Sequence, residues 1–574
     1  MNHPPTSLVD ILRWRAEEQP NQLAYRYLRD GEYDEVIMTY AELDRRVRSI
    51  ASLLQSCANE GDRALLIFPP GLDFIAAFFG CLYAKVLAVP VYPPHPARLE
   101  KNLPIILRVA ADAKPTVALL TSSLHDVIRS QKEIAEAFGN IKLLATDNDH
   151  VNDWANEWQQ YEIKKSDLAF LQYTSGSTSA PKGVRISHGN LLHNLDLIGK
   201  CFGVSNESHA VSWLPPYHDM GLIGGILQPL YSGFPITLIP HMMFLQRPFR
   251  WLQTISRYHA TISGAPNFAY DLCIKKIKTE QKELLDLSSW KVAFNGAEPV
   301  YHKTLDQFAD YFAPYGFRRG AFLPCYGLAE STLMVTGVNK NKIPSTQHLI
   351  ESELAQNQVI ITPEKTENTR TLVSCGQNIS DQDIRIISLK TLTECNEDEV
   401  GEIWVSGSSV GCGYWNKPSE TEFSFDAKLT NNPNKSFLRT GDLGFLHEGE
   451  LYITGRIKNL IISEGKNHYP HDIERTIEAT HPAIRQTGCA VFSTYKSGTE
   501  NIIVVVEIDY KVIVNSEIVI KAIRDALSTH HGLHVNKILL TNPGGIPKTT
   551  SGKIKHFLCK EYYLAETFNE IKSI

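Results

Sequence analysis

The sequence predicts an α/β protein: a large N-terminal domain of doubly wound α/β sheets with a β-rich subdomain, then a small C-terminal α+β domain. Apolar strand-like segments alternate with helix-like segments between residues 36 and 150, and again from residue 166 to about residue 336. Short strands separated by turn residues follow over residues 372–453. Alternating strands and helices produce parallel sheets with right-handed crossovers, which bind ligands at the carboxyl ends of their strands.

The chain is long enough for several domains, because 574 residues correspond to about four units of roughly 150 residues each. The last unit mixes strands with a helix and has the size of a separate small domain. The expected boundaries are a large domain at 1–457, subdomains at about 1–168, 169–371 and 372–457, and a small domain at 458–574.

Each element follows from its local pattern. Thr39 and Glu42 form a capping box that opens an amphipathic helix. Short apolar runs bounded by turn residues predict strands, and apolar residues with a 3.6-residue period predict helices. In chain order we expect a strand at 64–68, a helix at 72–84, a strand at 86–91, a helix at 99–113, a strand at 116–120, a helix at 125–138, strands at 142–145, 168–171 and 502–508, and a helix at 517–527.

One long segment, residues 220–246, contains no Asp, Glu, Lys or Arg and is long enough to suggest a membrane span. Pro229, Pro235 and Pro240, with Gly233, interrupt it, and proline breaks a helix. We therefore expect a buried helix, turn and strand, and no transmembrane segment.

The composition is that of an ordinary globular chain, with 43% hydrophobic and 21% charged residues. The net charge of −6 provides no overall attraction to nucleic acid, so a nucleic-acid partner is not expected. Ten cysteines lack any C-x-x-C pair and are expected to be buried free thiols. Residues 1–12 lack a basic and then apolar leader, which favours a cytoplasmic location.

A stretch of small and hydroxyl residues directly follows the expected strand at 168–171. Small residues let backbone N–H groups face an anion, hydroxyls add donors, and a lysine adds positive charge. The string is not a Walker loop, because its lysine precedes the glycine. A polar linker between strands is the alternative interpretation. The candidate phosphate-binding residues are Thr174, Ser175, Gly176, Ser177, Thr178 and Lys182.

Further motifs follow along nearly the whole chain, and with them the sequence resembles the adenylate-forming superfamily, which includes acyl-CoA synthetases, firefly luciferase and peptide-synthetase adenylation domains. The order of the motifs matches the order in that superfamily. After the phosphate loop they are Trp213-Leu-Pro-Pro-Tyr-His218-Asp219-Met-Gly-Leu222, Asn295-Gly-Ala-Glu-Pro299, Tyr326-Gly-Leu-Ala-Glu330, Arg439-Thr-Gly-Asp442, Gly455-Arg456-Ile-Lys458 and Pro547-Lys-Thr-Thr-Ser-Gly-Lys553.

The resemblance implies that a carboxylate attacks the α-phosphorus of ATP and gives an acyl-adenylate and pyrophosphate, with Mg²⁺ as cofactor. It makes Glu330 the magnesium ligand, Asp442 the acceptor for both ribose hydroxyls, and Lys553 the catalytic lysine of a mobile small domain. The structural alternatives are a surface glutamate, a turn aspartate and a flexible loop lysine. Lys548 is close enough to Lys553 to be confused with it.

The other implied roles concern the nucleotide, the hinge and the acyl group. The resemblance places Arg456 and Lys458 at the hinge, with Arg456 also beside the nucleotide. It makes His218 a candidate catalytic residue that gates or lines the acyl site. For a lone histidine a structural role is at least as common. The residues expected around the nucleotide are Asn295, Gly296, Ala297, Tyr326, Gly327, Leu328 and Ala329, and those expected in the acyl pocket are Asp219, Met220, Gly221, Pro266 and Phe268.

Two positions depart from the superfamily pattern: Ser179 replaces a glycine and Ala329 a threonine. With the strings at 218–222, 244–248 and 263–268, the second departure looks like the fatty acyl-AMP ligases. Those enzymes pass the acyl group to the phosphopantetheine arm of an acyl carrier protein. They carry an extra segment in the large domain, and the polar residues 351–370 are the candidate for it. An insertion packed near the hinge would restrict rotation of the small domain and so disfavour transfer to coenzyme A. A tolerated surface loop is the alternative.

The sequence therefore predicts a ligase that activates a medium-chain or long-chain fatty acid for a carrier protein. The uncharged segment supplies apolar surface for the chain, at ~0.8 kcal/mol per buried methylene. A long-chain acyl-CoA synthetase is the alternative enzyme, distinguished by consumption of coenzyme A. A non-catalytic adenylate-binding partner of a synthase is the alternative of another class, and the presence of Glu330, Asp442 and Lys553 together argues against it.

Overall fold

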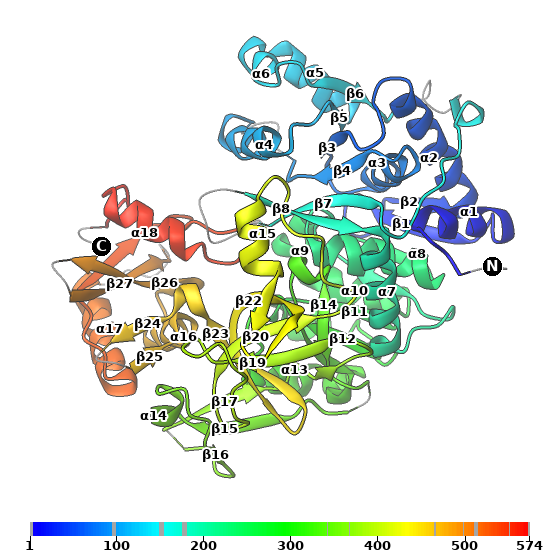
Figure 1. Cartoon of the computed structure of the whole chain (residues 1–574). Coiled ribbons are helices and arrows are strands. Elements are labelled where there is room, and N and C mark those ends of the chain that lie inside the picture. The colour runs from blue at the N-terminus through cyan, green and yellow to red at the C-terminus, as the bar shows by residue number, and fades with distance from the viewer. Residues whose placement is uncertain are drawn as a thin grey trace.

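The computed structural model of the chain describes residues 4–93, 99–148, 154–174, 181–340, 342–366, 368–463, 466–496, 499–509, 515–549 and 552–571. A six-stranded sheet forms the upper part of the molecule in Figure 1. All its neighbouring strands are parallel except the last pair. The order is β6 (Lys142–Ala145), β5 (Val117–Leu120), β3 (Arg63–Ile67), β4 (Leu87–Pro90), β7 (Leu168–Thr174) and β8 (Lys182–Ser187).

A fourteen-stranded sheet runs through most of the remaining large domain. Its strands from β13 to β1 are parallel, whereas β2 and the strands beyond β13 pair antiparallel. The order is β19 (Asp383–Ile387), β20 (Gly401–Ser406), β22 (Asn432–His447), β23 (Glu450–Arg456), β18 (Gln377–Asn378), β14 (Met334–Gly337), β13 (Phe322–Gly327), β12 (Val292–Asn295), β11 (Ile262–Ala265), β9 (Ala210–Ser212), β10 (Ile236–Leu238), β1 (Leu23–Leu28) and β2 (Glu35–Thr39), with β21 (Ala427–Leu429) on β22.

Most of the helices pack apolar side chains against these sheets, and the predicted fold class is confirmed. The capping box also forms: the Thr39 backbone N–H donates to Glu42 Oε2 at 2.8 Å, and the Glu42 N–H donates to Thr39 Oγ1 at 3.3 Å. The large-domain helices include α1 (Leu8–Glu18), α2 (Tyr40–Gln55), α3 (Leu72–Tyr83), α4 (Leu99–Ala113), α7 (His188–Phe202), α10 (Phe249–Arg257), α11 (Asn267–Lys276), α12 (Thr279–Lys282), α13 (His302–Phe312) and α15 (Pro418–Phe425).

The single helix predicted at 125–138 is wrong, because the chain forms α5 (Ser122–Ser130) and α6 (Lys132–Ala137) with an extended backbone at Gln131. Ile128 and Ile134 are six residues apart, which places them on different faces of a continuous helix. Breaking the helix lets both side chains turn into the core, where they are 1% and 6% exposed.

Most of the uncharged segment is buried, as predicted, although Met242 and Leu245 near its end are exposed. It forms a π-helix, η3 (Met220–Leu227), followed by α8 (Gln228–Ser232), β10 and α9 (His241–Gln246). Among the described residues no helix combines the length and apolar character needed to cross a bilayer. Gly221 lies directly against the preceding loop, since a Cβ there would collide with the carbonyl oxygen of Pro215.

Replacing Gly221 with alanine is expected to lower the free energy of unfolding by about 1–3 kcal/mol, the usual cost of overpacking. The added methyl must displace backbone rather than a flexible side chain. Gly224→Ala is the matched control in the same helix, because its Cβ would meet only the Leu333 side chain at 3.6 Å. Denaturant unfolding of both variants tests this, and equal losses of stability would contradict it.

The predicted insertion has secondary structure of its own. A separate three-stranded sheet contains β16 (Ile361–Thr362), β15 (Thr346–Ile350) and β17 (Thr369–Val373), with α14 (Glu351–Leu354) between β15 and β16. Its strands are short and their side chains are mostly half-exposed, which explains the polar sequence. The small sheet lies beside the C-terminal part of the chain, at the bottom of Figure 1.

The C-terminal part packs around its own apolar core. The predicted strand at 502–508 and helix at 517–527 are confirmed within longer elements. A sheet of β26 (Ile484–Lys496), β27 (Thr499–Ile508) and β28 (Lys537–Thr541) carries the helices, and a two-stranded sheet precedes it. The remaining elements are β24 (Ile461–Ser463), β25 (Lys466–His468), α16 (Pro470–Thr480), α17 (Ser516–His531) and α18 (His556–Leu564).

Candidate active site

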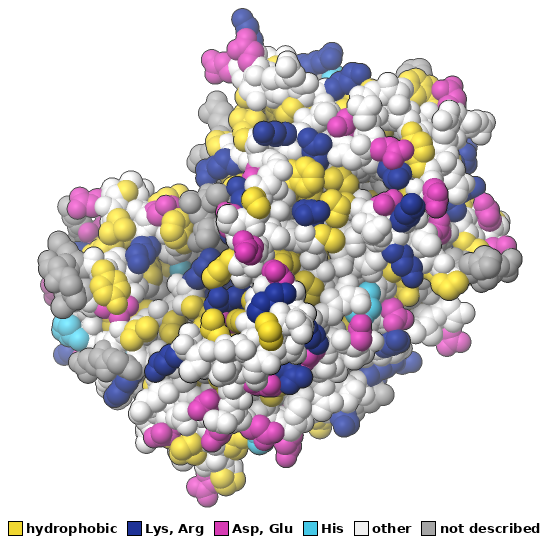
Figure 2. Space-filling view, in the orientation of Figure 1, with side chains coloured by type: hydrophobic (Ala, Val, Ile, Leu, Met, Phe, Trp, Pro, Cys, Tyr) yellow, Lys and Arg dark blue, Asp and Glu magenta, His cyan; other side chains and the backbone are white. Residues whose placement is uncertain are grey.

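A cavity of about 1850 Å³ lies between the C-terminal part of the chain and the large domain. Its wall includes residues within two positions of the carboxyl ends of β9, β11, β12 and β13, where a parallel sheet is expected to bind its ligand. Basic side chains gather on the surface where these two parts meet (Figure 2), and Lys182, Arg456 and Lys458 line the cavity itself. The side of the cavity that these three side chains form suits an anionic ligand.

The cavity brings together most of the residues that the sequence predicts. Lining residues from the predicted set are Thr174, Lys182, His218, Asp219, Met220, Gly221, Pro266, Phe268, Ala297, Tyr326, Gly327, Leu328, Ala329, Glu330, Asp442, Arg456, Lys458 and Lys553. Ser175, Gly176, Ser177 and Thr178 lie outside the described residues. Asn295 and Gly296 are behind the wall: Asn295 is fully buried, and its Nδ2 donates to Asn267 Oδ1 at 3.3 Å.

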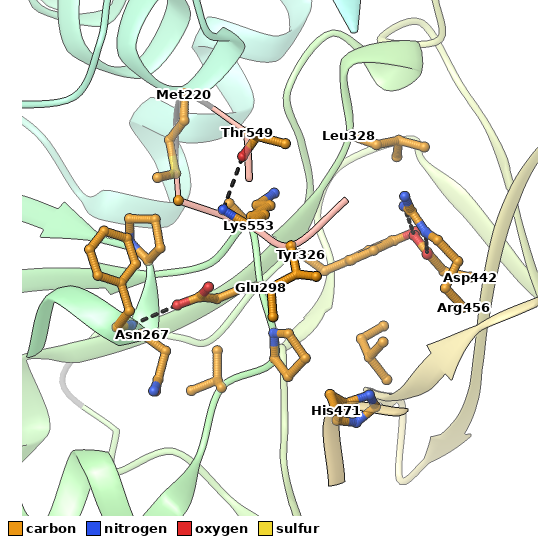
Figure 3. Close-up of a pocket in the computed structure, with 18 of the residues that line it drawn as sticks. Met220, Asn267, Glu298, Tyr326, Leu328, Asp442, Arg456, His471, Thr549 and Lys553 are labelled. Atoms are coloured by element: carbon orange, nitrogen blue, oxygen red, sulfur yellow. Dashed lines mark hydrogen bonds and ion pairs between the residues drawn. The ribbon is translucent and has the colours of Figure 1, made fainter. Parts of the chain in front are cut away.

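Asp442 is held by two neighbours that the sequence analysis did not connect with it. The Tyr326 hydroxyl donates to Asp442 Oδ2 at 2.8 Å, and Arg456 Nε donates to Asp442 Oδ1 at 2.7 Å (Figure 3). Arg456 faces Asp442 because β22 and β23 pair these two residues in register. Each oxygen of the Asp442 carboxylate can accept more than one hydrogen bond, so Asp442 can also accept hydrogen bonds from two neighbouring hydroxyls of a ligand.

Glu330 lies in a short 3₁₀ helix, η6 (Ala329–Ser331), and its Oε1 accepts a hydrogen bond from the Tyr414 hydroxyl at 2.8 Å. Burial raises the pKa of this carboxyl, and the hydrogen bond from Tyr414 opposes that shift. The Tyr414 ring also carries the Lys182 ammonium 4.8 Å from its centroid. Tyr414 is therefore a site residue that no motif in the sequence revealed.

Glu330 fits the expected role of a ligand for a hard cation. It is an oxygen donor facing the cavity, and a bound cation would offset the burial of its charge. Among the described residues no group of three or more His, Cys, Asp or Glu side chains is suited to hold a metal ion. A cation bound here would take Glu330 as its protein ligand and phosphate oxygens as others.

Lys553 enters the cavity from the loop after β28. Two hydrogen bonds join Lys553 to Thr549 and close this loop. The Thr549 N–H donates to the Lys553 carbonyl at 2.7 Å, and the Lys553 N–H donates to Thr549 Oγ1 at 3.0 Å (Figure 3). Burial lowers the pKa of the Lys553 ammonium, while the charges of Asp219 and Glu298 raise it.

The structure also separates Lys553 from its neighbour Lys548. Lys548 Nζ donates to Glu507 Oε2 at 3.2 Å, and Glu507 is 1% exposed within the C-terminal part of the chain. That ion pair gives Lys548 a local structural partner.

The expected acyl pocket begins at the start of η3. Asp219 Oδ1 accepts the Met220 backbone N–H at 2.7 Å and so caps this helix. Burial raises the pKa of Asp219, and the Lys553 charge opposes the shift. Burial and the nearby Lys553 lower the pKa of His218 to about 3, so its imidazole is neutral at physiological pH. His218 can therefore line the site only as an uncharged group.

Ala297 and Lys458, predicted to flank the nucleotide and to lie at the hinge, both line the cavity. Ala297 has φ +70°, an uncommon left-handed backbone for a residue with a side chain, and this turn brings residues 297–299 to the cavity. Lys458 lies in a 3₁₀ turn, η7 (Ile457–Asn459). Burial and the charges of Lys182 and Arg456 lower its pKa, so it sits on the cationic side of the site.

Similarity to known families agrees with this geometry. A family model described as AMP-binding enzyme matches residues 12–415, and one described as Disco-interacting protein 2-like, AMP domain, matches residues 458–573. The chain belongs to the AMP-binding enzyme family, and the predicted membership of the adenylate-forming superfamily is confirmed.

Three relatives illustrate the likeness. The medium-chain-fatty-acid–[acyl-carrier-protein] ligase JamA of Moorena producens is 43% identical over 570 residues, which cover 98% of this chain and 96% of JamA. The crystal structure of a fatty acyl-adenylate ligase from Legionella pneumophila with acyl adenylate and pyrophosphate is 43% identical, with a TM-score of 0.77 and coverage of 97% and 96%. The putative fatty-acid–CoA ligase FadD21 of Mycobacterium tuberculosis is 37% identical over 99% of both chains.

Proposed function

We propose that the protein is an ATP-dependent fatty acyl-AMP ligase. It activates a medium-chain or long-chain fatty acid to an acyl-adenylate with release of pyrophosphate, and it transfers the acyl group to the phosphopantetheine thiol of an acyl carrier protein. The observation that carries this proposal is the convergence of Glu330, Asp442 and Lys553 on one cavity, next to the uncharged segment that begins at Met220.

In the first half-reaction a fatty acid carboxylate oxygen attacks the α-phosphorus of ATP. The bond from that phosphorus to the bridging oxygen breaks, and pyrophosphate leaves with its electron pair. The Lys553 ammonium stabilises the charge that develops on the α-phosphate and carboxylate oxygens. Asp442, fixed by Arg456 and Tyr326, accepts the ribose hydroxyls and sets the position of the nucleotide. Mg²⁺, when bound at Glu330, supplies charge neutralisation for the phosphates.

In the second half-reaction the pantetheine thiolate attacks the acyl carbonyl carbon, and AMP leaves. The thioester keeps the acyl group activated on the carrier. The alternative acceptor is coenzyme A, which carries the same thiol, so the choice of acceptor depends on how the C-terminal part of the chain can move.

The candidate insertion, residues 351–370, supports a preference for the carrier, because it contacts the C-terminal part of the chain. The Asn467 N–H donates to the Ala355 carbonyl at 2.9 Å, and Asn467 Nδ2 donates to Asn357 Oδ1 at 2.9 Å. Arg370 Nε forms an ion pair with Asp472 Oδ2 at 3.0 Å. These contacts favour the arrangement in which Lys553 occupies the cavity, and rotation away from it must break them.

Replacing Arg370 with alanine is expected to raise acyl-CoA formation by up to about tenfold, which corresponds to 1.4 kcal/mol of lost restraint. Arg385→Ala is the matched control, since Arg385 pairs with Asp383 and Glu394 within the large domain. Mass spectrometry of products made with free coenzyme A measures the change. Equal acyl-CoA yields from both variants would reduce residues 351–370 to a surface loop.

Pyrophosphate exchange tests the proposed activation directly. The protein is incubated with ATP, Mg²⁺, labelled pyrophosphate and saturated fatty acids of different length. Exchange that depends on a medium-chain or long-chain acid supports the proposal, whereas no exchange with any acid favours the non-catalytic adenylate-binding partner.

The cytoplasmic location remains a prediction, supported by ten free cysteines, a pattern typical of reducing compartments.

A further inference from the structure

Glu298 is a carboxylate that lines the cavity, and no role follows for it from the motif that contains it. It follows Ala297, whose left-handed backbone turns the chain toward the cavity after β12. The Phe268 N–H, in the first turn of α11, donates to Glu298 Oε1 at 2.6 Å (Figure 3). One oxygen is therefore fixed by the backbone of the expected acyl pocket, and the carboxylate lines the cavity.

The charges around Glu298 come from different parts of the chain. Asp271, from α11, carries a like charge that raises the pKa of Glu298. The Glu298 charge in turn raises the pKa of the Tyr301 hydroxyl. Lys553, from the C-terminal part, is the opposite charge, and Asp219 at the start of η3 faces the same ammonium. Glu298 and Lys553 thus belong to two parts of the chain that meet across the cavity.

A buried ammonium is costly unless an anion accompanies it. The Lys553 side chain has no ion pair within 4 Å among those that the structure describes, and its charge is favoured by Asp219 and Glu298 at longer range. Asp219 and Glu298 each accept one backbone N–H. Both carboxylates therefore keep acceptor capacity and charge for Lys553, with the larger effect from Asp219 and the second from Glu298.

We propose that Glu298 is a positioning residue that holds the Lys553 ammonium in the cavity during adenylation. The inference rests on the proposed function, because it assigns Glu298 to the first half-reaction only. In the second half-reaction Lys553 is not required at the α-phosphate, so Glu298 has no part in thioester formation.

The proposal implies a pH dependence with a definite sign. Burial, with a smaller contribution from the like charge of Asp271, raises the pKa of Glu298 to about 7 against the opposing effects of the Phe268 N–H and the Lys553 charge. The carboxylate is ionised above this pKa, so adenylation gains its counter-charge as the pH rises through about 7. Below that pH Glu298 is protonated and contributes no charge.

The test compares kcat/KM for ATP in pyrophosphate exchange, between pH 5.5 and 9, for the wild type and for Glu298→Gln. The amide keeps an oxygen for the Phe268 N–H but cannot ionise. We expect the variant to be about tenfold slower at pH 8, equivalent to one pKa unit of charge stabilisation, and within about twofold of the wild type at pH 6. The rise through pH 7 should vanish in the variant.

Three comparisons keep the outcome unambiguous. Asp271→Asn should move the rise to lower pH, because it removes a like charge beside Glu298. Glu298→Asp should retain the rise at a reduced rate. Transfer from supplied dodecanoyl-AMP to a loaded carrier protein should be unchanged in Glu298→Gln, which also shows that this variant is folded.

The possible failures are distinguishable. A wild type that gives no exchange at any pH overturns the proposed function itself. An active wild type whose pH rise persists in Glu298→Gln overturns the role of Glu298. Equal loss of exchange and of transfer in Glu298→Gln makes Glu298 a structural residue and also contradicts the inference.

Discussion

Replacing Lys553 with alanine is expected to slow acyl-adenylate formation by about 10²–10³-fold, the usual effect of removing one preorganised group that stabilises transition-state charge. Lys553 enters the cavity from a loop whose backbone is hydrogen-bonded at Thr549, so the start of its side chain is already positioned. Transfer of an acyl group from supplied dodecanoyl-AMP to a carrier protein should be nearly unaffected. Pyrophosphate exchange and single-turnover transfer measure the two half-reactions separately.

Lys521→Ala is the control for this variant, because Lys521 is an exposed lysine on α17 of the same part of the chain. It removes the same charge without touching the cavity, so both half-reactions should continue at the wild-type rate. If Lys553→Ala lost both half-reactions equally, the lysine would have a role beyond adenylation, and the assignment made here would be wrong.

Replacing Glu330 with glutamine is expected to lower kcat for adenylation by about 10²–10³-fold and to raise the Mg²⁺ concentration needed for half-maximal rate. The amide retains an acceptor for the Tyr414 hydroxyl but has no charge to bind a divalent cation. A Mg²⁺ titration of pyrophosphate exchange measures both effects. The shift in Mg²⁺ requirement distinguishes loss of a ligand from general damage to the site.

Glu420→Gln serves as the control for Glu330, since Glu420 is another cavity-lining carboxylate, carried by α15. It should leave the Mg²⁺ requirement unchanged. If Glu330→Gln lost activity with no change in that requirement, Glu330 would not be the metal ligand.

The sequence predicted the site best where each motif is contiguous and follows a strand. The string that ends in Glu330 lies next to the cavity because it follows β13, and a parallel sheet brings the carboxyl ends of its strands to one edge. The same logic placed His218 and Phe268 at the wall. Local patterns were sufficient for these residues. The string that ends in Asp442 also lines the cavity, but it lies within β22, which pairs antiparallel, so this rule does not account for its position.

Contacts between distant segments could not be predicted in this way. Tyr326 and Asp442 are 116 residues apart, and Tyr414 and Glu330 are 84 apart, so their hydrogen bonds appear only once the large sheet is assembled. Glu298 looked unremarkable in its motif because its charge matters only next to Lys553. The break at Gln131 was missed because a single 3.6-residue period was applied to the whole of residues 125–138. The apolar residues of α5 and of α6 follow two separate helical registers.

The most direct test of the account is the choice of acyl acceptor. The protein is incubated with ATP, Mg²⁺ and dodecanoate, together with either coenzyme A or a phosphopantetheine-loaded carrier protein, and the products are resolved by mass spectrometry. We predict dodecanoyl-AMP that persists with coenzyme A and is discharged onto the carrier. Rapid dodecanoyl-CoA formation would contradict the account and identify a long-chain acyl-CoA synthetase instead.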